Sequence, residues 1–149
     1  MRLQTATRIA LYATLELAGN PENQITASAI AEKYGISINH LAKVMRDLGR
    51  AGVVESVRGA GGGFRFAGNA KRTTLMDVIQ IFENVRGNAR APAREPGEAT
   101  PAGQALRQVL DEIDAITEAT LRSITLDTMF KLIQRQRADA AGQAPGATP

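Results

Sequence analysis

The chain has 149 residues, 44% of them apolar, which is enough for one domain with a buried core and an appendage. Cysteine is absent, which excludes disulfides, cysteine-bound zinc and iron–sulfur clusters held by cysteine. Residues 1–76 hold ten Lys or Arg and five Asp or Glu, a balance of +5, whereas residues 77–149 hold eight and ten, a balance of −2; the first half therefore favours a polyanionic partner.

Two helices are predicted in the first 34 residues. One spans about Thr5–Ala18 and ends at the helix-breaking sequence Gly19-Asn20-Pro21. The other spans Ala27–Tyr34 after a Thr26 cap, and Gly35 makes the turn that follows it. The apolar stripe expected to be buried in the first helix consists of Leu11, Leu15 and Ala18.

A third helix is predicted from Ile38 to Arg50, with Ser37 as its N-terminal cap. Its apolar residues recur at i, i+3, i+4 and i+7, which places them on one buried stripe, and its opposite face is polar and basic. The buried stripe is Leu41, Val44, Met45 and Leu48, and the opposite face carries Asn39, Ala42, Lys43, Arg46 and Arg50.

The periodicity changes from helical to alternating after Gly52. Residues Val53–Arg58 and Phe64–Phe66 are typical of two strands, and the glycines of Gly59–Gly63 indicate a tight turn between them. A phosphate-binding loop of an NTPase would need Gly-Lys-Ser or Gly-Lys-Thr at the start of a helix, so the strand that follows this turn argues against one.

The second half is predicted to be mainly helical. A helix of about 75–85 begins at a Thr74 cap with Asp77 at capping-box spacing, Thr100-Pro101 starts a long helix, and Thr125 caps a last helix to about Arg137. The expected organisation is a winged helix-turn-helix DNA-binding domain at 1–85, a flexible loop at 86–104, dimerisation helices at 105–137 and a disordered tail at 138–149.

The expected fold is thus mainly α with a small β-hairpin, a winged helix-turn-helix plus a long dimerisation helix. Its third helix is free to enter a major groove, and the hairpin, or wing, reaches a minor groove, where an arginine is electrostatically favoured. Between Lys43 and Arg72 there are seven Lys or Arg and two acids, which fits phosphate neutralisation. The residues expected to bind double-stranded DNA are Ser37, Asn39, His40, Lys43, Arg46, Arg58, Gly59 and Gly61.

The long helix carries an apolar stripe that a small winged domain cannot cover, so we expect a second copy of the chain to cover it. A two-fold axis between two copies would set the DNA half-sites about one helical turn apart. The residues expected at this homodimer interface are Leu106, Val109, Leu110, Ile113 and Ile116.

Three segments carry a likeness to a known family: Met1-Arg2-Leu3, the turn and helix start from Gly35 to Leu41, and above all Ser56–Phe64, with its Val-Arg-Gly-x-Gly-Gly-Gly-aromatic pattern. Over roughly residues 1–135 the chain resembles the IscR/NsrR/CymR (Rrf-type) bacterial winged-helix regulators. The resemblance implies a homodimer that crosses through the helix near 101–122 and binds a palindromic operator. It also implies that Asn39, His40 and Lys43 face the major groove and Arg58 the minor groove.

The chain departs from this family at the cluster ligands. Cluster-binding members carry three cysteines at six-residue spacing before the long helix, and some place an acidic ligand where this chain has Arg8. We therefore expect a member without an iron–sulfur sensor and with no other cofactor or metal. The positions that correspond to the cysteines are Ala91, Gly97 and Gly103 in one register, or Ala93, Ala99 and Ala105 in another.

Several alternatives stay open at this stage. His40, the only histidine, either contacts a base or phosphate or is a solvated residue at the edge of the buried stripe. The 86–104 loop is either a spacer or an element gated by a small-molecule or protein effector. Two functions are considered. The first is a homodimeric repressor of transcription, and the alternative is a protein-interaction module that keeps the winged fold without specific DNA binding.

An enzyme is not expected, because no nucleophile–base pair or other catalytic set can be assembled from these motifs. No apolar run approaches the roughly 20 residues of a membrane span, and no signal peptide is recognised, so we expect no membrane partner and a cytoplasmic location.

Overall fold

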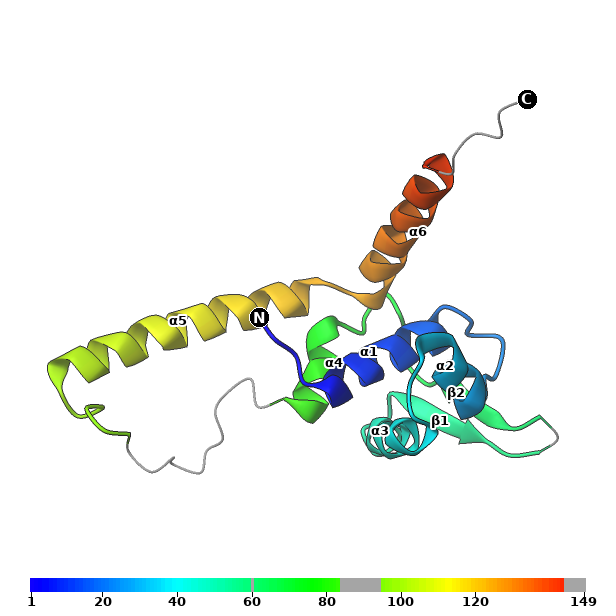
Figure 1. Cartoon of the computed structure of the whole chain (residues 1–149), viewed down its shortest axis with the longest axis horizontal. Coiled ribbons are helices and arrows are strands. Elements are labelled where there is room, and N and C mark those ends of the chain that lie inside the picture. Colours follow the sequence, from blue (N-terminus) through cyan, green and yellow to red (C-terminus); the bar gives the residue numbers. More distant parts are fainter. Residues whose placement is uncertain (60, 84–94, 144–149) are drawn as a thin grey trace.

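The computed structural model describes residues 1–59, 61–83 and 95–143. This part of the chain holds six helices and one antiparallel hairpin, which agrees with the expected winged fold (Figure 1). In chain order the elements are α1 (Thr5–Ala18), α2 (Ala27–Tyr34), α3 (Ile38–Arg50), β1 (Val54–Val57), β2 (Gly63–Phe66), α4 (Leu75–Phe82), α5 (Pro101–Ser123) and α6 (Leu126–Gly142).

The helices begin where the sequence places their caps. Each expected cap hydroxyl accepts a backbone hydrogen bond from the residue three positions on, which satisfies one free N–H of the first turn. At α4 the arrangement is a complete capping box, because the Thr74 N–H also donates to Asp77 at 2.8 Å. The capping residues are Thr26, Ser37, Thr74, Thr100 and Thr125.

The core forms around α1, which packs against α3 on one side and α4 on another. The buried stripe of α3 is the one predicted, with Leu41 and Leu48 fully buried. The stripe predicted for α1 is only partly right, because Leu11 and Leu15 are half-buried although Ala18 is buried. The deepest apolar positions of α1 are Ala10, Ala13 and Leu17; small side chains there let neighbouring helices approach closely.

The hairpin is shorter than predicted at its first strand. β1 covers Val54–Val57 rather than Val53–Arg58, and β2 starts one residue early, at Gly63. Val54 pairs with Phe66, and both side chains are buried against the helical body. The pairing therefore anchors the base of the wing to the core.

Three boundaries in the C-terminal half need correction. α4 ends at Phe82, because Glu83 is already extended, rather than at about residue 85. α5 starts at Pro101, so residues 101–104 are helical and do not belong to the expected loop. α6 continues past Arg137 to Gly142, so residues 138–142 are helical where a disordered tail was expected. The remainder of that tail, 144–149, and the loop residues 86–94 lie outside the described part of the chain.

α5 and α6 leave the body in different directions (Figure 1). The start of α6 is fixed to the body, since Leu126 is fully buried and its N–H donates to the Thr73 carbonyl at 2.9 Å. Most of α5 has no such cover from the described residues. It therefore projects as a separate arm.

Candidate nucleic-acid interface

The helix-turn-helix is formed by α2, Gly35 and α3. Gly35 adopts φ 64° and ψ 38°, a left-handed conformation in which glycine avoids the strain of a side chain. The Ile36 N–H donates to the Ala31 carbonyl at 2.9 Å and closes the turn. This turn sets α3 at a fixed angle to α2, with its apolar stripe inward and its polar face toward solvent.

The outer face of α3 is a row of exposed polar and cationic side chains. Ser37, Asn39, Lys43 and Arg46 are all exposed, so the structure brings these predicted residues onto one accessible surface. His40 differs because it is half-buried and borders a hollow of about 290 Å³ between α1 and α3. Arg8 and Tyr12 of α1 line the same hollow. The position of His40 is compatible both with a contact to a base or phosphate and with a solvated residue at the edge of the buried stripe.

The wing owes its shape to glycines. Gly59 and Gly61 have φ of 120° and 77°, which L side chains rarely adopt. Gly63 serves a different purpose, because a Cβ there would lie 2.6 Å from the Ile25 carbonyl oxygen. The glycine run thus makes the turn and also lets the return strand approach the segment before α2.

Most of the cations between Lys43 and Arg72 form no ion pair within the described ranges. Arg65 is held across the hairpin by Glu55, with its guanidinium 2.7 Å from the carboxylate. Of the other Lys and Arg residues between 43 and 72, none forms an ion pair within the described ranges. Those unpaired cations, which would meet phosphates at little desolvation cost, are Lys43, Arg46, Arg50, Arg58, Lys71 and Arg72.

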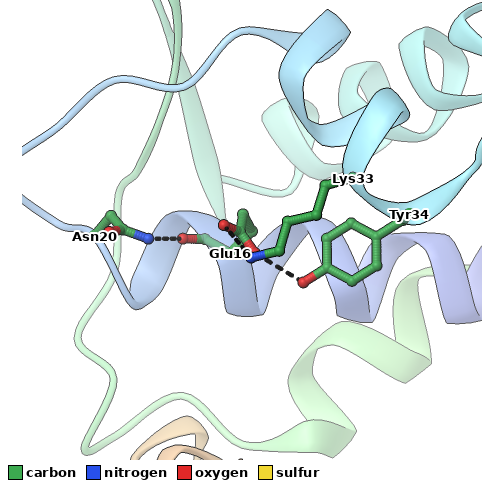
Figure 2. A network of polar contacts seen from close by, with 4 residues as sticks. All are labelled: Glu16, Asn20, Lys33 and Tyr34. Atoms are coloured by element: carbon green, nitrogen blue, oxygen red, sulfur yellow. Dashed lines mark hydrogen bonds and ion pairs between the residues drawn. The ribbon is translucent and has the colours of Figure 1, made fainter.

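A polar network joins the C-terminal end of α2 to α1 (Figure 2). The Glu16 carboxylate of α1 accepts hydrogen bonds from Lys33 Nζ at 2.8 Å and from Tyr34 Oη at 2.8 Å. Partial burial raises the pKa of Glu16, but these two hydrogen bonds together with the positive charges of Lys33 and Arg137 outweigh it, so the net pKa lies below the ordinary value of 4.5. Burial and the bond to Glu16 raise the pKa of Tyr34 to about 12.

Sequence reasoning missed this network. Glu16 lies outside every motif, and its partners are 17 and 18 residues away, so no local pattern indicates the contact. The Tyr12 ring stacks on Tyr34 with a centroid distance of 5.0 Å and adds a second link between α1 and α2.

The apolar stripe of α5 is exposed in the single chain. The exposed fraction ranges from 51% at Leu110 to 68% at Ile116, far above what an apolar side chain inside a core shows. No helix in the described part of the chain has the length and apolarity of a membrane span. The stripe consists of Leu106, Val109, Leu110, Ile113 and Ile116.

Comparison with known proteins agrees with this geometry. Residues 3–132 match the Rrf2 family, described as iron-dependent transcriptional regulators. The chain belongs to the Rrf2 family. It is 48% identical to the HTH-type transcriptional regulator BadM of Rhodopseudomonas palustris over 148 residues, which cover 99% of this chain and 93% of BadM.

Solved Rrf2-like structures share the fold over most of the chain. IscR of T. potens superposes with a TM-score of 0.72 at 26% identity, and the match covers 98% of this chain and 94% of IscR. CymR of B. subtilis, named as the global cysteine regulator of that organism, gives 0.70 at 27% identity, covering 87% of this chain and 95% of CymR. The resemblance drawn from the wing and the turn is confirmed, and the chain is a transcriptional regulator of this family.

The residues of this Rrf2 protein do not fit the iron–sulfur cluster of the cluster-binding members. The chain has no cysteine, and its described residues contain no group of three His, Asp or Glu side chains able to hold a metal. In one cysteine register Gly97 and Gly103 pack so tightly that a Cβ at Gly103 would collide with the Gly97 carbonyl. Ala91 and Ala93 lie outside the described residues.

Proposed function

We propose that this Rrf2 protein is a sequence-specific DNA-binding repressor that acts in the cytoplasm as a homodimer on a palindromic operator. The observation that carries the proposal is the exposed polar face of α3 beside a wing whose Arg58 has no ion pair in the described residues. Both lie on the basic half of the chain. A regulator of this family needs such a surface to reach its DNA.

In this proposal α3 reads the major groove. Asn39 lies in the first turn of α3, where its amide can pair with both edge atoms of an adenine. Lys43 and Arg46 lie further along the exposed face and contact phosphates, which adds affinity without sequence preference. Ser37 caps α3 and places the N-terminal amides of the helix near the DNA backbone.

The wing enters the adjacent minor groove. Arg58 directly follows β1 and is exposed, so its guanidinium can extend into the focused negative potential of a narrow groove. Gly59 and Gly61 give the tip a slim backbone without side chains that would collide with the groove walls.

The homodimer forms along α5. A second copy related by a two-fold axis would cover the exposed stripe from Leu106 to Ile116 and align two α3 helices with successive major grooves, about 34–36 Å apart. In this arrangement residues 1–83 bind DNA and α5 joins the copies. Bound across a promoter, such a dimer blocks access to it, which favours repression, and an effector that shifts the arms would relieve it.

The test is to select DNA fragments with the purified protein, to sequence them, and to identify the genes beside the recovered sites. We expect one palindromic motif with half-sites about one turn apart. Recovery of no motif, with no binding at low salt, would instead support a winged-fold module that binds another protein.

A further inference from the structure

The wing tip is tied to the segment between α1 and α2 by one side chain. Gln24 Nε2 donates a hydrogen bond of 2.7 Å to the Gly61 carbonyl, across 37 residues of sequence. Both residues are exposed, so the bond adds nothing to the core. It joins a loop outside the proposed DNA-binding surface to the part of the hairpin that has the greatest backbone freedom.

A second tie lies next to it but stops short of the tip. Ile25 and Phe64 exchange two backbone hydrogen bonds of 2.9 and 2.8 Å, which fix the return strand as far as Phe64. Beyond that point the turn contains Gly59 and Gly61 at positive φ. A cross-turn backbone bond from the Gly62 N–H to the Gly59 carbonyl at 2.9 Å lies within the turn and does not hold it against the body.

We propose that Gln24 is a positioning residue for DNA binding, which holds the wing tip through Gly61 so that Arg58 is presented to the minor groove. The inference rests on the proposed role of the wing. A glycine-rich tip without this bond samples many conformations, and docking must then order it, which weakens binding. Held by Gln24, the tip is already in place before DNA arrives.

The size of the effect follows from one exposed hydrogen bond. Gln24→Ala should weaken operator binding roughly two- to tenfold, the range that such a bond contributes. The thermal midpoint should not change, because Ile25–Phe64 and the β1–β2 pairs remain. Asn23→Ala is the matched control, since Asn23 is an exposed neighbour whose side chain makes no hydrogen bond to the described residues.

The decisive experiment is a double-mutant cycle on the selected operator duplex, with Gln24→Ala, Arg58→Ala and the double variant titrated over a salt series. We expect Gln24→Ala to weaken binding when Arg58 is present and to have no effect in the Arg58→Ala background. Its salt slope should fall toward that of Arg58→Ala. Trypsin should also cleave after Arg58 faster in free Gln24→Ala than in the wild type or Asn23→Ala.

The outcomes separate the two proposals. If Arg58→Ala weakens binding but Gln24→Ala does not, or weakens it equally in both backgrounds, the role assigned to Gln24 is wrong and the wing still docks. If Arg58→Ala binds like the wild type, wing docking itself is wrong, and the role of Gln24 is rejected with it. Unchanged trypsin cleavage in Gln24→Ala would show that the bond does not hold the tip.

Discussion

Tyr34 of α2 donates a 2.8 Å hydrogen bond to the Glu16 carboxylate of α1, and this contact links the central helix to the helix that carries the recognition turn (Figure 2). Lys33 binds the same carboxylate, so two consecutive residues at the end of α2 are held by one acid. Because Gly35 follows directly, the contact also fixes where α3 begins.

Removal of the Tyr34 hydroxyl should destabilise the fold. We expect Tyr34→Phe to lower the free energy of unfolding by about 1 kcal/mol at neutral pH, measured by urea denaturation. The folded-state pKa of Tyr34 is raised from 10.0 to about 12, so this stabilisation is complete below pH 10 and disappears as the pH rises through about 12. The difference from wild type should therefore shrink above pH 10.

Tyr12→Phe is the control for that measurement. It removes a hydroxyl that makes no hydrogen bond to the described residues and keeps the ring stack on Tyr34. A difference between Tyr34→Phe and wild type that stayed constant from pH 8 to 12 would show that the hydroxyl is not the source of the effect.

Residues on the exposed face of α3 should contribute to DNA binding in two different ways. Lys43→Ala should weaken specific and random DNA alike and reduce the salt slope by about one, because a phosphate contact is lost. Asn39→Ala should change the base preference at one operator position more than the total affinity. Binding to single-base operator variants at fixed salt separates the two, and equal losses on all sequences for Asn39→Ala would assign it to the DNA backbone.

A charge in the α5 stripe should separate the two copies. Ile113 is 52% exposed in the single chain, so Ile113→Asp leaves the monomer fold intact but places a carboxylate in the proposed interface. We expect a monomer in sedimentation equilibrium and a large loss of operator affinity. Gln108→Asp adds the same charge on the same helix and should stay dimeric, because Gln108 lies on the face of α5 opposite the stripe. A dimeric Ile113→Asp protein would place the interface elsewhere.

DNA binding should not depend on iron. The chain has no thiolate, so the purified protein should contain no stoichiometric iron, and chelators or nitric oxide should leave operator affinity unchanged. Elemental analysis and titration before and after chelation provide the measurement. A coloured preparation with bound iron would contradict the expectation that this protein holds no iron–sulfur cluster.

The sequence was informative where structure is local. Caps such as Ser37 and the buried stripe of α3 depend on residues within two helical turns, and both were predicted. The Glu16–Tyr34 contact was not, because it depends on how two helices pack. The prediction of a disordered tail from residue 138 is wrong at the end of α6, because alanine is the strongest helix former and the alanines of 138–142 extend the helix to Gly142.

The residues of the candidate DNA surface stay a prediction from local sequence patterns, whereas the contact that holds its wing tip has no such pattern. Arg58 and the wing glycines form a recognisable local pattern. The bond from Gln24 to Gly61 has no local signal, since it forms only when the hairpin folds back on the segment before α2. Positions that present a functional residue are therefore harder to predict than the residue itself.

The most direct test of the central claim is a titration of the selected operator and a scrambled duplex with wild type and Arg58→Ala over a series of salt concentrations. We expect wild type to prefer the operator, with affinity falling linearly on a log–log plot against salt, and Arg58→Ala to lose about 1–3 kcal/mol with an unchanged thermal midpoint. Equal binding of both duplexes by the wild type, or an Arg58→Ala variant as tight as the wild type at every salt concentration, would contradict sequence-specific recognition through α3 and the wing.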